Sequence, residues 1–209
     1  MLLRDETLNR FTDALASGTP APGGGAAAAL SGALAAALIC MVGGLTVSKE
    51  KYQQYHGQIR EMMERAAKLR EKLLAGVDED NEAYNRVAAV FKMPRTEPEQ
   101  KASRAEAMQT ALKGAVQPPL EAMRLALECA ELAERAFGKI NVSCASDLGV
   151  AAMCSLACVK SAWLNVKINL SGIKDREFTD KILPEAREIL EKAEKLTEGI
   201  YQKIEADIR

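Results

Sequence analysis

The chain has 209 residues, a length that fits one domain with a substantial buried core. Its formal net charge is −1, from 28 basic and 29 acidic side chains, and this balance argues against a nucleic-acid-binding protein. The five cysteines lack the spacing of a disulfide framework, and the first ten residues are too charged for a secretory signal. We therefore expect a cytoplasmic protein in which residues 1–209 form a single domain.

Helical periodicity dominates the chain, and the alternation typical of β-strands is absent. Apolar residues spaced by three and four predict helices over residues 8–15, 24–47, 48–91, 98–116, 120–137, 144–170 and 180–208. The segments PRTEPEQ and SGIKDREFTD are predicted loops, and Pro118-Pro119 is predicted to end one helix and start the next. The predicted fold is all-α, a multihelical bundle of about six or seven helices, some of them interrupted.

The segment 21–47, APGGGAAAALSGALAAALICMVGGLTV, contains no charged residue. It lacks the lysine and the preceding strand of a phosphate-binding loop. Its alanine-rich composition, with no second charge-free span of that length, argues against a membrane span. A small-residue helix lets neighbouring backbones approach closely, and Gly23, Gly24 and Gly25 would expose N–H groups that favour an acceptor or anion. The simpler interpretation is a tight turn into a buried helix.

Asp80 interrupts an apolar stripe. The spacing that joins Leu69, Leu73 and Val77 next reaches Asp80 and then continues to Tyr84. A carboxylate on a buried face either finds a partner or has its pKa raised by desolvation, as a general acid or base requires. The alternatives are a structural carboxylate with a partner and an exit of the stripe to solvent.

The predicted helix 144–170 carries polar residues at both ends of one stripe. Asp147 stands in its first turn, where an aspartate can simply complement the helix dipole. Asn165 and Asn169 lie one turn apart near the other end, and two such amides suit hydrogen bonding either to a heterocycle or to another helix.

Other chemistries find little support. His56 is the only histidine and lies in a charged stretch, so we expect it on the surface and expect no site built on a nucleophile and a histidine. Cys154 and Cys158 are one turn apart, but no C-x-x-C pair or histidine accompanies them, so no metal site is expected.

Three segments together resemble the formiminotransferase–cyclodeaminase family: TPAPGGGAAAALSGALAAALICMVGGLT, VDEDNEAYNRVAAVFKMP and NVSCASDLGVAAMCSLACVKSAWLNVKINL. The resemblance spans essentially the whole chain, in order, and covers the cyclodeaminase part of the family. It implies an all-helical homodimer that binds folate in a cleft near the subunit interface, and the composition argues separately against a membrane partner. One departure is Ala26, where the family pattern has serine, and this puts a hydroxyl contact at that position in doubt.

The resemblance also implies roles for individual residues. Asp80 would be the catalytic carboxylate, with Asp147 as the second. Gly23 to Gly25 would line the pocket, the pair Asn165 and Asn169 would bind substrate, and Lys49 would attract the glutamate tail of folate.

The implied activity is that of a folate one-carbon enzyme. The first reading is a formiminotetrahydrofolate cyclodeaminase, which converts 5-formiminotetrahydrofolate to 5,10-methenyltetrahydrofolate and ammonia. The alternative is a methenyltetrahydrofolate cyclohydrolase that yields 10-formyltetrahydrofolate. In either case the tetrahydrofolate derivative is the substrate, and no tightly bound cofactor is expected. A further alternative is a non-catalytic bundle that binds folate or a protein, in which ion pairs would neutralise Asp80 and Asp147.

Overall fold

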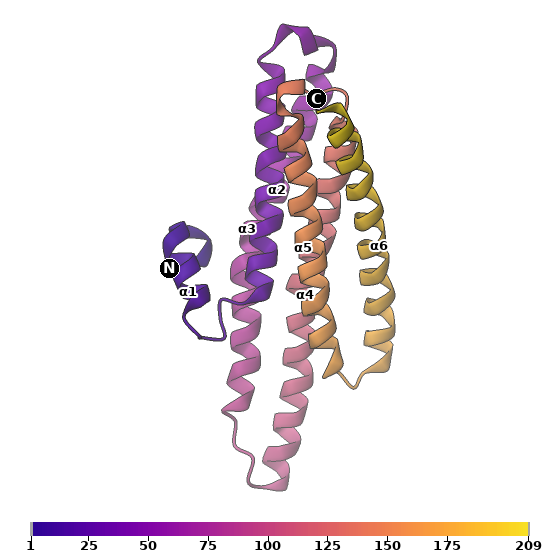
Figure 1. Cartoon of the computed structure of the whole chain (residues 1–209). Helices are drawn as coiled ribbons and strands as arrows, with labels where there is room; N and C mark the ends of the chain where they lie inside the picture. The colour runs from indigo at the N-terminus through magenta and orange to yellow at the C-terminus, as the bar shows by residue number, and fades with distance from the viewer. Residues whose placement is uncertain (1, 209) are drawn as a thin grey trace.

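The computed structural model describes residues 2–208, and within this range the chain forms six α-helices, three short 3₁₀ helices and no β-strand (Figure 1). The prediction of an all-α bundle is therefore confirmed. The α-helices are α1 (Leu8–Ala16), α2 (Gly24–Val47), α3 (His56–Phe91), α4 (Pro98–Ala136), α5 (Ala145–Ser171) and α6 (Arg176–Asp207). The 3₁₀ helices are η1 (Leu3–Asp5), η2 (Glu50–Tyr55) and η3 (Val142–Cys144).

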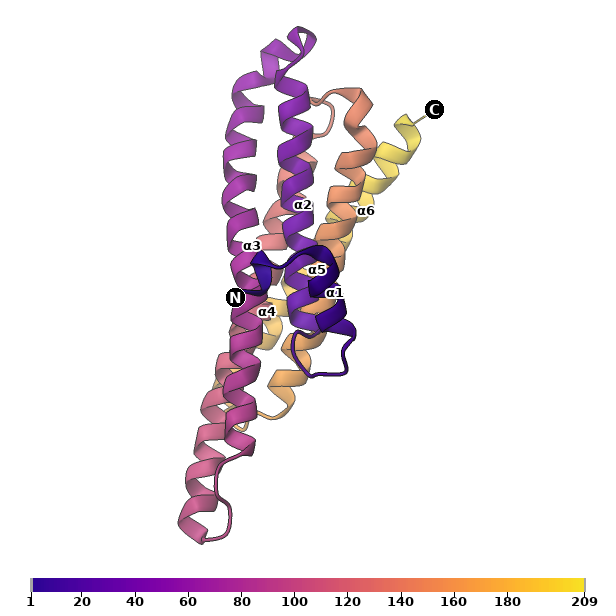
Figure 2. The same cartoon turned by 90° about the vertical axis from the view of Figure 1, so that its left-hand side faces the viewer.

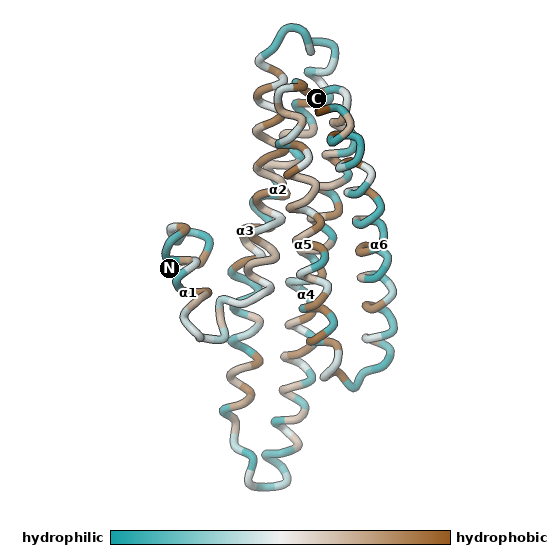
Figure 3. Tube along the Cα trace, in the orientation of Figure 1, coloured by the Kyte–Doolittle hydropathy of each residue, from teal (hydrophilic) through white to brown (hydrophobic). Residues whose placement is uncertain are grey.

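Helices α2 to α6 form an elongated bundle in which α2 and α5 are central. Helix α2 packs against α3, α4 and α5, and α5 packs in addition against α6. The hairpin of α3 and α4 extends beyond the other helices at one end, and α1 lies outside the bundle beside α2 (Figures 1 and 2). Apolar residues are concentrated along α2 and α5, whereas much of α6 and the tip of the hairpin are hydrophilic (Figure 3).

The small residues of α2 allow close helix packing. A β-carbon on Gly32 would lie 2.8 Å from Leu73 Cδ2 of α3 and 3.0 Å from Cys158 Sγ of α5, so any larger residue here would require these side chains to shift. Neighbouring Ala35 and Ala36 are fully buried. The segment is thus a core helix, as the small-residue pattern predicts.

Two segments, Gly24–Val47 and Val142–Ser171, are long and apolar enough to cross a membrane by length and composition alone. The bundle buries 56% of the most apolar window of the first and 44% of the second. Burial among neighbouring helices therefore covers about half of each window, and the remaining residues are half-buried or exposed.

The predicted interruption at Pro118 and Pro119 is wrong. Helix α4 runs through both prolines without a break, and both rings are buried. A proline inside a helix leaves the carbonyl four residues earlier without its N–H donor. For Pro119 this is the Ala115 carbonyl, which instead accepts a hydrogen bond of 2.8 Å from the side-chain amide of Asn169 on α5. Helix α5 thus supplies the hydrogen-bond donor that Pro119 lacks.

The predicted loop SGIKDREFTD is wrong in its second half, because α6 begins at Arg176 and not near residue 180. Asp175 caps this helix: its side chain accepts a 3.1 Å hydrogen bond from the Phe178 N–H. The helix also continues through Pro184.

The N-terminal segment is tied to α3 by a buried carboxylate, Asp78. Its Oδ1 accepts a 2.6 Å hydrogen bond from the Leu3 N–H, and its Oδ2 lies 3.3 Å from Arg4 Nε. Phe11 of α1 is buried in a small cluster with Ala26 of α2. These contacts place the N-terminal segment against the start of α2, next to the predicted site.

Candidate functional site

The candidate site is centred on the Asp80 carboxylate of α3, which lies against the first turn of α2. A β-carbon on Gly25 would overlap this carboxyl group and would lie only 2.5 Å from its Oδ2. The first N–H groups of an α-helix have no partner within the helix, and Gly23 at the N-cap has no side chain to serve them. Asp80 therefore occupies the position of a capping anion, supplied by another helix.

Two effects act on the protonation of Asp80. Burial is the larger, and it raises the pKa of the carboxyl group above its ordinary value because the charged form loses hydration. The backbone amide of Ala26 favours the charged form and lowers the pKa, but by less. The outcome is a carboxyl group with a raised pKa, as the interruption of the apolar stripe predicts. Such a group can accept or return a proton nearer neutral pH than an exposed aspartate.

Asn165 of α5 joins this cluster from the opposite side. Its Nδ2 and Oδ1 lie 3.6 and 3.8 Å from the position that a β-carbon on Gly24 would take. The Nδ2 donates a 2.9 Å hydrogen bond to the Ser161 carbonyl of its own helix. Three helices thus bring Asp80, the glycine turn and Asn165 together, and the roles that the resemblance implies for them stay predictions.

Asn169 lies one turn further along α5 and has a partner within the protein. Its Nδ2 is the group that donates to the Ala115 carbonyl of α4. Of the two interpretations that the sequence leaves open for this amide, the structure shows the contact with another helix.

Asp147 and Lys49 do not join the cluster within one chain. At 1.5 Å per residue, the 18 residues between Asp147 and Asn165 place them about 27 Å apart along α5. The length of α2 likewise places exposed Lys49 about 36 Å from Gly25. Both lie at the end of the bundle where the Asn141 N–H donates to Thr46 Oγ1 (3.0 Å). Their implied roles stay predictions, and a single chain does not bring them to Asp80.

Asp80 differs from a structural carboxylate such as Asp78 because it forms no ion pair within the described residues. Within residues 2–208, neither Asp80 nor Asp147 takes part in an ion pair, whereas Asp78 pairs with Arg4. The non-catalytic alternative predicts ion pairs at both residues, so the structure does not support this part of it. Asp78, which stands two positions before Asp80 and is more buried, is not among the residues predicted from the sequence.

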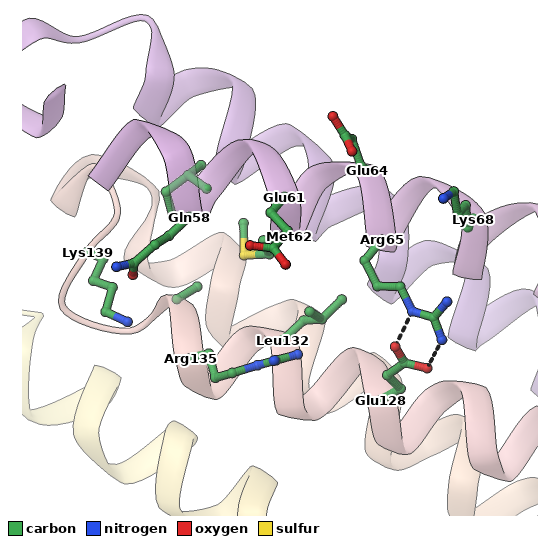
Figure 4. Close-up of a pocket in the computed structure, with 12 residues that line it drawn as sticks. Gln58, Glu61, Met62, Glu64, Arg65, Lys68, Glu128, Leu132, Arg135 and Lys139 are labelled. Carbon is green, nitrogen blue, oxygen red and sulfur yellow. Dashed lines mark hydrogen bonds and ion pairs between the residues drawn. The ribbon is translucent and has the colours of Figure 1, made fainter. Parts of the chain in front are cut away.

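A groove of about 490 Å³ lies elsewhere, between α3 and α4, and none of the predicted site residues lines it (Figure 4). The guanidinium of Arg65 spans it and makes two hydrogen bonds to the Glu128 carboxylate. Its walls carry both acidic and basic side chains, with Glu61 of α3 opposite Arg135 of α4. Because its walls carry charges of both signs, and Arg65 pairs with Glu128 across it, this groove is a weaker candidate than the cluster at Asp80.

The thiols do not offer a reactive or metal-binding site. All five cysteines are free, and burial raises the pKa of Cys158 to about 12, which keeps it protonated. In the described part of the chain, no group of three histidine, cysteine, aspartate or glutamate side chains lies close enough to hold a metal ion.

The fold and the site together define a class of protein, an all-helical bundle with a partly buried carboxylate at a glycine-rich helix start. Residues 7–188 match the family model described as formiminotransferase-cyclodeaminase. A methenyltetrahydrofolate cyclohydrolase from Methylorubrum extorquens is 39% identical to this chain, and the match covers 98% of both proteins. The formiminotetrahydrofolate cyclodeaminase of Thermotoga maritima, known from a crystal structure, is 30% identical with a TM-score of 0.82, covering 99% of this chain and 97% of its own.

The chain belongs to the formiminotransferase-cyclodeaminase family, as its three motif segments predict. A formimidoyltransferase-cyclodeaminase from Gallus gallus is also similar, with 34% identity over 89% of this chain but only 34% of its own length. This chain therefore corresponds to about a third of that longer relative and to nearly the whole of the cyclohydrolase.

Proposed function

We propose that this protein is a tetrahydrofolate one-carbon enzyme that acts on the carbon bridging N5 and N10, with Asp80 as its proton-transfer group. The observation that carries the proposal is the desolvated Asp80 carboxylate, which has no ion pair within the described chain and lies against the glycine turn at the start of α2. Membership of an enzyme family whose named relatives act on such substrates supports it.

Two reactions share this reacting centre. In cyclohydrolysis, water adds to the methenyl carbon, the bond from that carbon to N5 breaks, and the formyl group stays on N10. In cyclodeamination, N10 attacks the formimino carbon and ammonia leaves, which closes the methenyl ring. Each reaction passes through a tetrahedral carbon and moves a proton from the attacking group to the leaving nitrogen.

Cyclohydrolysis stands first in the proposal. The relative named as a cyclohydrolase matches over nearly the whole of both chains and has the higher identity, 39%. Cyclodeamination is the second candidate, because the cyclodeaminase with a solved structure also matches over nearly its whole length, at 30% identity. Neither reaction changes the oxidation state of the folate, so the proposal includes no resident redox cofactor.

Asp80 suits the proton transfer in both reactions. As a carboxylate it takes the proton from the attacking water or from N10, and as a carboxylic acid it delivers the proton to the departing nitrogen. The negative charge of the carboxylate also stabilises the cationic, amidinium-like carbon. The raised pKa favours the return step, because a more basic carboxylate holds the proton long enough to donate it.

The groups around Asp80 provide polar contacts for the heterocycle. The amide of Asn165 lies beside Gly24, and the Asp80 carboxylate lies beside Gly25, the next residue of the same turn. We propose that these groups orient the pterin ring so that its bridging carbon meets Asp80. A side chain at either glycine would occupy this space.

We further propose that the protein acts as a homodimer in the cytoplasm. Helices α2 and α5 share an exposed apolar face, defined by Leu34, Met41, Leu45, Val150, Leu164 and Ile168, whose exposed fractions range from 41% to 68%. Leu164 neighbours Asn165, so a second copy on this face would cover the candidate site and exclude water from it. The five free cysteines support a reducing compartment.

Replacement of Asp80 by asparagine tests the proposal. In Asp80→Asn the side-chain oxygen still caps α2, but the group no longer accepts a proton, so turnover should fall by roughly 10²- to 10⁴-fold while the fold is kept. The measurement is steady-state turnover of both folate substrates, with circular dichroism as a check on folding. Glu79→Gln, an exposed carboxylate one residue earlier, is the matched control and should keep full activity. Retention of most activity in Asp80→Asn would remove Asp80 from the mechanism.

A further inference from the structure

We propose that Asn169 positions the site and does not bind the substrate. Its amide supplies the hydrogen bond that Pro119 removes from α4, and this bond holds α5 in the register that places Asn165 against Gly24. The kinetic part of this inference rests on the proposed function, whereas the hydrogen bond and its energetic role do not.

Helix α4 contains two adjacent prolines, Pro118 and Pro119. In an α-helix each carbonyl accepts the N–H of the residue four positions later, and proline has no N–H. Pro118 and Pro119 therefore leave the carbonyls of Gly114 and Ala115 without helical donors. Gly114 is half-buried, whereas Ala115 is only 6% exposed. A buried carbonyl without a donor is costly, so Ala115 is the position that requires a replacement.

Asn169 provides the replacement donor, and the carbonyl that it serves determines the orientation of its amide. The Ala115 carbonyl can only accept, so the NH₂ group of the Asn169 amide must face it, at 2.8 Å. A substrate that took this NH₂ group as its donor would leave the carbonyl of Ala115 unsatisfied. The amide is therefore committed to α4.

The same bond determines where Asn165 lies. Asn165 precedes Asn169 by one turn on the same face of α5, and its amide approaches Gly24 of α2. Helix α5 packs between α2 and α4, so its position along α4 sets which of its residues meets the start of α2. The other polar ties at this end join Gln109 and Lys113 of α4 to residues 172–175, which lie beyond the end of α5. Within the helix pair, the Cys158 thiol also donates to the Ala122 carbonyl (3.7 Å), three turns before Asn169, so the Asn169 bond is the tie nearest to Asn165.

A double-mutant cycle with Pro119→Ala tests the inference. An alanine at position 119 restores the backbone N–H that the Ala115 carbonyl lacks. In the native background, Asn169→Ala should lower the Tm by roughly 2–10 °C, because it strands a buried carbonyl. In the Pro119→Ala background, the same substitution should change the Tm by less than about 2 °C, because the helix itself now satisfies the carbonyl.

The Michaelis constant separates positioning from substrate contact. If Asn169 acts through the carbonyl, Asn169→Ala should raise KM in the native background and leave it within about twofold in the Pro119→Ala background. A rise in KM of similar size in both backgrounds would make Asn169 a substrate ligand and overturn the inference. Asn165→Ala is the control that should raise KM in both backgrounds. If Asn169→Ala alone fails to fold, KM can still be compared between Pro119→Ala and the double variant. A raised KM in the double variant would still make Asn169 a substrate ligand.

The two proposals fail in distinguishable ways. If the native protein turns over neither folate substrate, the proposed function fails and the KM comparison is lost, but the thermal cycle remains. Equal losses of Tm in the two backgrounds would then show that Asn169 does not serve the carbonyl freed by Pro119, and would overturn this inference by itself.

Discussion

At the scale of single residues, two opposing effects act on the pKa of Asp80: its burial and its position at the start of a helix. Burial disfavours its charge, whereas the backbone amide of Ala26 favours it, and burial has the larger effect on the pKa. Many carboxylates at helix starts are exposed and gain stability from this arrangement. Asp80 differs because its surroundings destabilise the charged form. The resulting rise in its pKa is the property that a proton-transfer group requires.

The raised pKa of Asp80 has a consequence for stability. Between its ordinary pKa and the raised value, the folded state binds more protons at this group than the unfolded state, so stability should decrease as the pH rises through that window. At neutral pH the charged Asp80 therefore opposes folding. Asp80→Asn should have a higher Tm than the native protein near neutral pH, and the difference should shrink as the pH is lowered to about 4.

Thermal denaturation of both proteins across this pH range measures the effect. Glu79→Gln is the control and should show no such pH-dependent difference from the native protein, because Glu79 is exposed. If Asp80→Asn is less stable at neutral pH, or if its advantage grows in acid, then burial does not dominate at this residue.

At the scale of helices, the site depends on the close contact between the first turn of α2 and α3. The triple glycine and the stripe that ends in Asp80 are both visible in the sequence, and each predicts part of the site. Their direct contact is not visible, because it depends on how two helices about 55 residues apart pack together. Ala26, which stands where the family pattern has serine, still contributes its backbone amide to the contact.

The helix contact predicts that Gly25 is not replaceable. In Gly25→Ala the new methyl group would overlap the Asp80 carboxyl, so the carboxyl must move or the helices must separate. We expect at least a 10²-fold loss of turnover, which assays with both folate substrates would measure. Gly76→Ala is the matched control on α3: its methyl group would sit at an ordinary 3.6 Å from Ala29 and should be tolerated. Full activity in Gly25→Ala would show that the contact with Asp80 has no catalytic role.

Two helix boundaries show where local sequence signals fail. Pro118 and Pro119 predict an interruption because proline removes a backbone donor, but the compensating amide of Asn169 lies 50 residues further along the chain. The start of α6 at Arg176 could have been found, since Asp175 is a good N-cap residue and its side chain does cap the helix. Asp78 could not have been separated from Asp80 by local pattern, because its partners, Leu3 and Arg4, are distant in sequence.

At the scale of the whole molecule, the predicted site residues fall into two groups at different ends of the bundle. Asp80, the glycine turn and Asn165 form one group, and Asp147 and Lys49 lie about 27 Å or more away. If Asp147 or Lys49 acts on the same substrate, a second copy of the chain must supply it. The exposed apolar face of α2 and α5, which borders Asn165, is where we propose that this copy docks.

Disruption of this face should separate the subunits. The double substitution Leu164→Glu and Ile168→Glu would place two carboxylates in an apolar interface, so the mass in solution should fall by half at micromolar concentration. Light scattering after gel filtration measures the mass, and turnover should fall with it. Leu183→Glu alters an exposed leucine of α6 outside the face and should leave the dimer intact. An unchanged mass in the double variant would place the interface elsewhere.

The central claim is that this chain acts on the bridging carbon of a tetrahydrofolate derivative. The most direct measurement mixes the purified protein separately with 5,10-methenyltetrahydrofolate and with 5-formiminotetrahydrofolate and follows the methenyl absorbance. We expect protein-dependent loss of absorbance with the first substrate. Protein-dependent appearance from the second would keep the chemistry and assign the cyclodeaminase reaction instead. A rate no higher than the blank with both substrates would contradict the claim.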